Sequence, residues 1–395
     1  MRAGPASVLP QDGGILVGRA WAGVPGESAP RVVSAQKGKL YDLTARFSTV
    51  AGLLNSAEPS VAARAVVGLD RDLGPIELVV ANTLSRARDV RVPTLLAPCD
   101  LQAIKASGVT FLISLQERVV EEAARGDPQR AAELRAVLST ELASLAGVRP
   151  GSAEAAAAKA WLIERSLWSQ YLEVAIGPDA EIFTKAQPLS ALGLGADIGI
   201  LRSSQWNNPE PEVVLAVNHA GRIVGATLGN DVNLRDIEGR SGLLLGKAKD
   251  NNGSCAIGPF IRLFDAQFGL DDVRRAELTL QVRGRDGFHL HGTSCMQRIS
   301  RDPQDLVRQT MGPHHAYPDG MMLFLGTMFA PTQDRDTPGH GFTHHVGDVV
   351  TIESPQLGTL VNRVDYCDAI EPWSYGFAAL LASLTRPNGT DSLPM

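Results

Sequence analysis

The stretch WNNPEPEVVLAV, residues 206–217, places two glutamates one residue apart and then enters an uninterrupted apolar run. A short apolar run rich in valine is typical of a strand that is buried on both faces. Pro209 and Pro211 favour an extended backbone around the pair. On such a backbone, Glu210 and Glu212 share one face and can reach a common point. Because burying neighbouring like charges is unfavourable, the pair either faces water or holds a cation.

A third carboxylate follows in the segment GATLGNDVNLRDIEG, where Asp231 comes at the expected end of a strand. Three carboxylates on extended or turn backbone form a hard-oxygen site that suits Mg²⁺, with Mn²⁺ as the alternative. The competing interpretation is two solvated glutamates and a turn-forming aspartate, and the glutamate pair alone favours it. The neighbouring motifs decide between the two interpretations.

Composition restricts the class of protein. The chain has 395 residues, enough for two domains, and its 37 lysines and arginines against 43 aspartates and glutamates give a net charge of −6. That balance argues against a nucleic-acid-binding surface. Four cysteines without a CxxC pair are typical of reduced thiols. The start lacks a signal-peptide core, and no apolar run approaches the ~20 residues that span a bilayer. We therefore expect a soluble cytoplasmic protein without nucleic-acid or membrane partners.

The pattern of strands and turns predicts an α+β, β-rich fold. Short strands punctuated by turns over residues 1–95 predict a small N-terminal α+β domain, and residues 96–395 form the expected catalytic domain. From about residue 181 onward, short β-branched runs and glycine turns predict a mixed, largely antiparallel β architecture.

A helical block over residues 112–175 interrupts the strands. Helical periodicity covers 114–125 and resumes over 129–146. The alanine-rich run at 152–175 predicts one further helix, with Ser152 as its N-cap.

Four motifs in order give the C-terminal half its family resemblance. They are PEPEVVLAVN, GRIVGATLGNDVNLRDIEG, GKAKDNNGSCAIGPF and GDVVTIESPQLGTLVNRV. Over about residues 180–370 the chain resembles the fumarylacetoacetate hydrolase superfamily, and four ordered motifs are more specific than any one of them. The resemblance implies a mixed β-sandwich roll preceded by a small N-terminal domain. It also implies a homodimer or a dimer of dimers.

The resemblance implies roles for individual residues. Glu210, Glu212 and Asp231 match the family's magnesium ligands. Lys249, in AKDNNGSC, matches the lysine that reaches the substrate, and Ser254, near it in the sequence, is expected to contact the substrate as well.

Two further positions follow from the same resemblance. The pair Gly326-Thr327 matches the residues that hold the substrate carboxylate. This chain continues as GTMFAPTQD where many members have GTPxGV, so Met328 and Phe329 would change the shape of the pocket wall. Glu181, 29 residues before Glu210, resembles the acidic residue of the sugar-acid dehydratase branch.

That branch implies a reaction. The substrate would be a small 2-oxo acid, 2-keto-3-deoxy-D-xylonate, dehydrated to 2,5-dioxopentanoate in oxidative pentose catabolism. The metal would stabilise an enolate formed at C3, and Glu181 would protonate the departing C4 hydroxyl. Lys249 is either the C3 base, if burial lowers its pKa, or an ammonium that stabilises the enolate.

Two alternatives remain open from the sequence. One is an acylpyruvate-type C–C hydrolase, which the sequence disfavours because all eight histidines lie at His219 or later and none is upstream of the glutamate pair. The other is a 2-oxo-acid-binding module without turnover, which the retention of Lys249 and Glu181 disfavours.

Several weaker signals have ordinary interpretations. Glu117, Arg118 and Glu121 are expected on a solvated helix face, with a lid over the pocket as the alternative. Arg202 is a candidate contact to substrate oxygens, although an outward-facing loop explains it equally well. Asp236 is expected to pair with a neighbouring arginine or to cap a turn.

Two other signals, for a zinc site and for a dinucleotide site, are disfavoured by their spacing. The histidines of HGFTHHVGD, residues 340–348, lack a carboxylate or cysteine at a familiar zinc spacing. The glycine-rich run at 192–199 lacks the GxGxxG pattern of a dinucleotide site.

Overall fold

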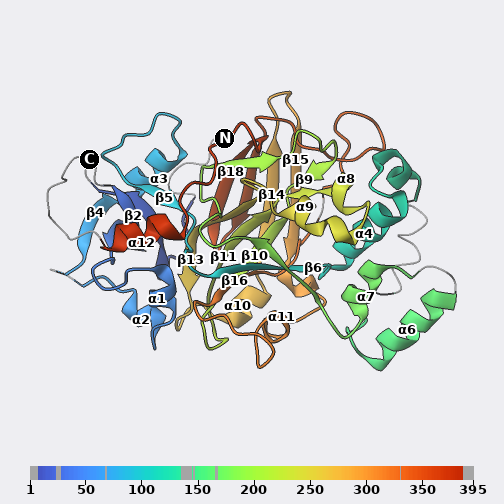
Figure 1. The fold of residues 1–395 in the computed structure, drawn as a ribbon, viewed down its shortest axis with the longest axis horizontal. Helices are drawn as coiled ribbons and strands as arrows, with labels where there is room; N and C mark the ends of the chain where they lie inside the picture. The colour runs from blue at the N-terminus through green and yellow to red at the C-terminus, as the bar shows by residue number, and fades with distance from the viewer. Residues whose placement is uncertain are drawn as a thin grey trace.

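Two β-sheets packed face to face form the centre of the molecule, with helices at both ends of the pair (Figure 1). The computed structural model describes residues 8–23, 28–66, 69–134, 145, 147–164, 168–329 and 331–385. This arrangement confirms the predicted β-rich α+β class and the sandwich-type packing.

The larger sheet has eleven strands among the described residues and runs through both halves of the chain. Its order is β4 (Arg71–Pro75), β3 (Lys39–Asp42), β2 (Ala29–Gln36), β1 (Leu16–Ala22), β13 (Cys255–Leu263), β11 (Ile223–Asp231), β10 (Pro211–Val217), β16 (Met321–Phe324), β6 (Ala103–Gly108) and β7 (Glu181–Ala186), with β5 (Thr94–Leu96) paired to β1. The antiparallel pair β1–β13 joins the N-terminal strands to the C-terminal ones. The domain boundary near residue 95 stays a prediction.

The smaller sheet has five strands within the described ranges. Its order is β15 (His289–Cys295), β14 (Glu277–Arg283), β17 (Val349–Ser354), β18 (Gly358–Tyr366) and β8 (Asp197–Ile200), and β9 (Asn207–Asn208) pairs separately with β12 (Asn233–Leu234). Of the described strand pairs, β6–β16 and β8–β18 are parallel and the rest are antiparallel. The largely antiparallel architecture is therefore confirmed.

Strand β10 shows why residues 213–217 are apolar throughout. Val213 and Leu215 pack into the core between the two sheets, whereas Val214 and Ala216 pack into a second core on the opposite face. All four side chains are fully buried. Because successive side chains of a strand point to opposite faces, a strand covered on both sides needs an unbroken apolar run.

Short helices cover the N-terminal end of the larger sheet. They are α1 (Val50–Leu54), α2 (Pro59–Ala62) and α3 (Ile76–Leu84). The C-terminal helix α12 (Phe377–Thr385) lies at the same end (Figure 1). The preceding segment also reaches this end, since the ring of Tyr375 packs edge-on against Trp21 at 6.0 Å between ring centroids.

The helical block lies at the opposite end of the molecule (Figure 1). It contains α4 (Leu112–Ala124), α6 (Ala153–Glu164) and α7 (Gln170–Ile176). Helix α4 confirms the predicted helix at 114–125. Residues 128–134 are helical too, and most of the predicted continuation to 146 lies outside the described residues.

The prediction of a single helix over 152–175 is wrong. Ser152 does cap the start of α6, because its Oγ accepts a hydrogen bond from the backbone N–H of Ala155 at 3.1 Å. Residues 168–169 are not helical, however, and Ser169 caps a second helix by accepting from the N–H of Leu172. A serine inside the helical pattern thus starts a new helix, as its ability to satisfy free N–H groups allows.

The remaining helical segments are short and connect the strands. They are α8 (Arg235–Glu238), η3 (Gly242–Leu244), α9 (Leu245–Lys249), α10 (Leu270–Arg274), η4 (Met296–Arg298) and α11 (Pro303–Thr310). Among the described helices, none combines the length and the apolar character that crossing a bilayer requires. The four cysteines are free, as expected.

Candidate active site

The three predicted carboxylates meet where β10 begins and β11 ends. Glu210 and Asp231 are joined by a backbone hydrogen bond of 3.0 Å, from the N–H of Asp231 to the carbonyl of Glu210. Glu212 pairs with Gly229 on the adjacent strand. Each of the three residues offers a carboxylate oxygen within 4.8 Å of the others, and all three are at most 2% exposed. Two antiparallel strands therefore build the cluster that the spacing predicted.

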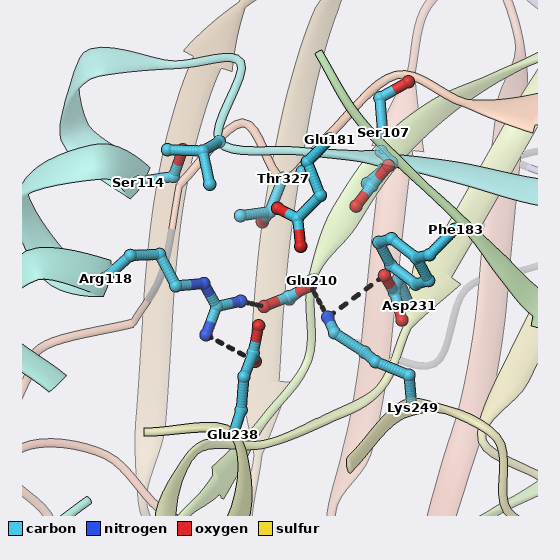
Figure 2. Close-up of a pocket in the computed structure, with 13 residues that line it drawn as sticks. Ser107, Ser114, Arg118, Glu181, Phe183, Glu210, Asp231, Glu238, Lys249 and Thr327 are labelled. Atoms are coloured by element: carbon cyan, nitrogen blue, oxygen red, sulfur yellow. Dashed lines mark hydrogen bonds and ion pairs between the residues drawn. The ribbon is translucent and has the colours of Figure 1, made fainter. Parts of the chain in front are cut away.

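Three cations surround this carboxylate cluster. The Nζ of Lys249 lies 2.6 Å from Oε2 of Glu210 and 3.1 Å from Oδ2 of Asp231 (Figure 2). The Nζ of Lys185 lies 2.7 Å from Oδ1 of Asp231. Arg118 donates to Oε1 of Glu210. Glu210 and Asp231 are thus each held between two cationic groups.

Glu212 has a different electrostatic environment. Its Oε2 accepts a hydrogen bond of 2.7 Å from the backbone N–H of Gly326. Burial, together with the charges of Asp231 and Glu210, raises the pKa of Glu212 well above the ordinary value. By contrast, Lys185 and Lys249 outweigh the effect of burial and lower the pKa of Asp231. A dication bound by the three carboxylates would remove the repulsion that Glu212 experiences, and an all-oxygen donor set suits Mg²⁺.

A small cavity opens beside the carboxylate cluster (Figure 2). Its volume is about 10 Å³, on the order of one water molecule. It is lined by Ser107, Gly108, Val109, Ser114, Arg118, Glu181, Phe183, Glu210, Glu212, Asp231, Glu238, Lys249 and Thr327. No histidine is present among these lining residues.

Glu181 is the lining carboxyl without a partner. It begins β7, opposite Gly108 of β6. None of the described residues donates a hydrogen bond to its carboxylate or forms an ion pair with it. Burial, with the charge of Glu238, raises the pKa of Glu181 to about 7. A Cβ atom at position 108 would lie 1.8 Å from Oε2 of Glu181, so the glycine makes room for this carboxyl.

Lys249 ends helix α9 and is 2% exposed. Burial lowers its pKa, but Asp231 and Glu210 raise it more, so that the pKa lies above the ordinary value and the side chain is an ammonium. Ser254 does not line the cavity. Its Oγ donates to the carbonyl of Lys249 at 2.7 Å, and Lys185 also donates to this carbonyl. Ser254 therefore fixes the backbone that carries the lysine.

The pair Gly326-Thr327 lies directly after β16. Gly326 has φ +99°, and a Cβ there would lie 2.0 Å from Oγ1 of Thr110, so the position requires glycine. Thr327 lines the cavity, and its Oγ1 donates to the carbonyl of Phe329 at 3.1 Å. Met328 is fully buried in the core between the sheets, rather than in the cavity wall.

Arg202 lies apart from the cavity. Its Nε is 2.7 Å from Oδ2 of Asp368, its guanidinium stacks on Tyr366 at 4.1 Å, and both members of the ion pair are exposed. Asp236 accepts hydrogen bonds from the hydroxyl of Ser204 and the N–H of Gln205, so that of its two expected roles it has the one in a turn rather than the pairing with an arginine. Its carboxylate thus holds the turn that precedes the glutamate pair.

The prediction of a solvated face on helix α4 is wrong. Glu117, Arg118 and Glu121 are 6%, 7% and 1% exposed. Arg118 bonds to Glu121 at 2.7 Å and to Glu238 at 2.8 Å, in addition to its contact with Glu210. These bonds make α4 one wall of the cavity.

A second arginine completes this buried network. Arg235 lies 2.6 Å from Oε1 of Glu121 and 2.8 Å from Oε2 of Glu117, and its guanidinium stacks on Trp206 at 4.3 Å. Its partners are more than a hundred residues away in the sequence. No local pattern identifies them, although the sequence LRDIEGR, which begins three residues after Asp231, placed these charges near the carboxylate cluster.

The histidines of residues 340–348 lie outside the cavity lining. The Nδ1 of His344 is 3.2 Å from Asp348, and the Nε2 of His345 is 3.0 Å from Asp336. Within the described ranges, the cluster of Glu210, Glu212 and Asp231 is the one group of three side chains arranged to hold a metal ion.

Sequence comparison finds a family and two curated relatives. Residues 137–365 match the family described as fumarylacetoacetate (FAA) hydrolase C-terminal. The chain is 31% identical over 188 residues to a 2-dehydro-3-deoxy-D-arabinonate dehydratase of Saccharolobus solfataricus, covering 47% of this chain and 58% of that protein. It is also 31% identical over 202 residues to a probable 2-keto-3-deoxyxylonate dehydratase of Haloferax volcanii, covering 51% and 65%. The chain therefore matches less than two thirds of either relative.

Structural comparison extends the likeness of fold to most of the chain. A 2-keto-3-deoxy-D-arabinonate dehydratase complexed with magnesium and 2,5-dioxopentanoate superposes with a TM-score of 0.60 at 20% identity, over 89% of this chain and 99% of that one. At this identity the superposition shows a shared fold.

Proposed function

We propose that this chain, which belongs to the fumarylacetoacetate hydrolase family, is a magnesium-dependent dehydratase that converts 2-keto-3-deoxy-D-xylonate to 2,5-dioxopentanoate. The observation that carries the proposal is the buried cluster of Glu210, Glu212 and Asp231 beside the unpartnered carboxyl of Glu181 and the ammonium of Lys249. Two curated relatives that are named for 2-keto-3-deoxy pentonates support the substrate class.

The substrates for which these two relatives are named are the same compound. In a 2-keto-3-deoxy pentonate, C2 is a carbonyl and C3 a methylene, so that C4 is the remaining stereocentre. C4 has the same configuration in D-xylose and D-arabinose, and both sugars therefore give the same 2-keto-3-deoxy acid.

The residues present fit a resident metal ion. Glu210, Glu212 and Asp231 would hold Mg²⁺, or Mn²⁺ as the alternative, through one oxygen each. When bound, such an ion supplies Lewis acidity that stabilises negative charge on the oxygen of a 2-oxo acid. The substrate carboxylate would lie against Thr327, which lines the cavity.

Lys249 and Glu181 have separate roles in the proposed reaction. Loss of a proton from C3 leaves an enolate, and the ammonium of Lys249 stabilises its charge from within the cavity. The hydroxyl at C4 then leaves as water after accepting a proton from Glu181, whose pKa near 7 keeps a large protonated fraction at neutral pH. This elimination leaves a C3=C4 double bond conjugated with the 2-oxo group, while C5 is still an alcohol. Glu181, now a carboxylate, then takes a proton from C5 and a proton returns to C3, which gives the C4=C5 enol. That enol becomes the aldehyde of 2,5-dioxopentanoate, so that the overall change is the loss of one water.

The surroundings of Glu181 suit this role. Its carboxyl faces the cavity and has no donor among the described residues to hold it ionised, whereas Glu210, Glu212 and Asp231 all accept hydrogen bonds or ion pairs. An acylpyruvate-type hydrolase would need a group that activates water, and the described cavity lining provides no imidazole for it.

A coupled assay tests the proposal. The protein is given 2-keto-3-deoxy-D-xylonate with Mg²⁺, and 2,5-dioxopentanoate is followed with a semialdehyde dehydrogenase; an acylpyruvate is tested in parallel. We expect turnover of the sugar acid, its loss in EDTA, and its loss in Glu181→Gln. Turnover of the acylpyruvate alone would make the protein a hydrolase, and tight 2-oxo-acid binding without turnover would make it a binding module.

A further inference from the structure

A second, larger pocket adjoins the catalytic cavity. It has a volume of about 600 Å³, within the range of small-molecule sites, and Glu181 lines both spaces. The inner cavity, at about 10 Å³, has room for little more than a water molecule, so that a bound substrate cannot lie wholly inside it. A substrate whose 2-oxo group lies at the carboxylate cluster therefore extends past Glu181 into this outer pocket.

Two arginines line the outer pocket. Arg125 terminates helix α4, and Arg240 follows helix α8. Both side chains are exposed, and neither forms an ion pair or a side-chain hydrogen bond with any of the described residues. The carboxylates that line the pocket are those of Glu122 and Glu181, and neither is bonded to an arginine of this pair.

The backbone brings the two arginines to the same rim of the pocket. Each of them is adjacent to a glycine, and the two glycines are in contact. A Cβ at Gly239 would lie 3.0 Å from the Cα of Gly126, and a Cβ at Gly126 would lie 2.6 Å from the carbonyl oxygen of Asp236. Both arginines line this one pocket, and guanidinium groups bind carboxylates and phosphates through paired N–H donors.

We propose that Arg125 and Arg240 form a subsite for a second anionic group, a carboxylate or a phosphate, at the end of the substrate remote from its 2-oxo acid group. This inference rests on the proposed function, because it assumes that the 2-oxo acid end binds at Glu210, Glu212 and Asp231. The subsite extends the substrate class from simple pentonates to longer 2-oxo acids that carry a terminal anion.

Matched pairs of unreactive 2-oxo acids test the subsite. In each pair a monoacid is compared with the diacid of equal chain length: 2-oxopentanoate with 2-oxopentanedioate, then the six- and seven-carbon pairs. Binding in the presence of Mg²⁺ is measured by calorimetry, and the readout is the ratio of the two Kd values. We expect the diacid to bind about tenfold tighter or more at one chain length, as one charge-assisted contact provides. An acid of that length with a terminal phosphate shows which anion the subsite prefers.

Variants then assign the preference to the two arginines. Arg125→Gln and Arg240→Gln should each reduce the ratio, and together should bring it to about one, without changing the Kd of the monoacid. Arg64→Gln, which removes an exposed arginine of the N-terminal region, is the matched control and should leave the ratio unchanged. Both pocket arginines are exposed, so the variants should fold.

The outcomes separate the subsite from the function on which it rests. A ratio near one at every chain length, with monoacid binding intact, overturns the subsite and leaves the proposed function standing. An equal loss of monoacid and diacid binding in the variants also overturns it, because the arginines would then attract any anion rather than bind the terminal group. If no monoacid binds in the presence of Mg²⁺, the proposed function fails and the subsite with it.

Discussion

Replacing Glu181 by glutamine should change the pH dependence of stability as well as the activity. Burial and the charge of Glu238 raise the pKa of Glu181 to about 7 in the folded protein, whereas an unfolded chain has an ordinary value of about 4.5. The folded state therefore binds more protons than the unfolded state between pH 4.5 and 7. Its stability falls as pH rises through this range, because ionising the enclosed carboxyl is unfavourable.

The magnitude follows from the two pKa values. The difference between about 4.5 and about 7 corresponds to about 3 kcal/mol of lost stability above pH 7, and to about 1 kcal/mol at pH 5. The residue as a whole is partly exposed, so about 3 kcal/mol is a ceiling. Glutamine has nearly the same shape and no charge. The free energy of unfolding of Glu181→Gln, relative to that of wild type, should therefore rise by about 2 kcal/mol as pH increases from 5 to 8.

Urea unfolding of the metal-free protein across this pH range measures the effect. The exposed substitution Glu277→Gln is the control and should show no such trend. The variant should also lose about 10²-fold or more in kcat, and wild-type kcat should fall as pH rises above 7, because the acid that protonates the leaving hydroxyl becomes ionised. Stability curves of variant and wild type that run parallel from pH 5 to pH 8 would refute the assignment of a raised pKa to Glu181.

Three further substitutions test the surroundings of the site. Arg118→Met removes the shared partner of several buried carboxylates, so we expect the free energy of unfolding to fall by about 3–5 kcal/mol, measured by urea unfolding; a loss below about 1 kcal/mol would mean that the network is not formed. Gly108→Ala would place a methyl group against the carboxyl of Glu181, the proposed acid, and should lower kcat at least tenfold. Gly246→Ala, with open space around it, should leave kcat unchanged; equal kcat values for the two would contradict the packing. Lys185→Met removes the ammonium that is paired with Asp231, a proposed metal ligand, and should raise the Mg²⁺ concentration needed for half-maximal binding about tenfold, measured by calorimetry. Unchanged binding would show that the lysine does not position Asp231.

The carboxylate cluster was predictable because its determinants are local. The alternation of strand side chains places Glu210 and Glu212 on one face, and antiparallel pairing brings Asp231, the last residue of β11, beside the start of β10. The burial of β10 on two faces was equally predictable, because a half-exposed strand would alternate polar and apolar residues, whereas this one is an unbroken run of valine, leucine and alanine.

The charged network was not predictable for the opposite reason. On helix α4, Glu117, Arg118 and Glu121 follow a pattern that ordinarily marks a solvated face, because isolated buried charges are unfavourable. Their charges are paired by partners distant in the sequence: Arg235 pairs with both glutamates, and Arg118 pairs with Glu210 and Glu238. Arg202 is the opposite case: a candidate for the site that lies exposed outside it. Its position before the glutamate pair gave no indication of its partner, Asp368.

Calorimetric titration with Mg²⁺ tests most directly whether Glu210, Glu212 and Asp231 act together on one ion. The wild-type protein should take up one ion per chain, and more tightly when a 2-oxo acid is present. Glu212→Gln should lose this uptake, although the urea concentration at its unfolding midpoint should be at least that of wild type. Wild-type protein that takes up no Mg²⁺, or a Glu212→Gln variant that binds it as well as wild type, would contradict the account.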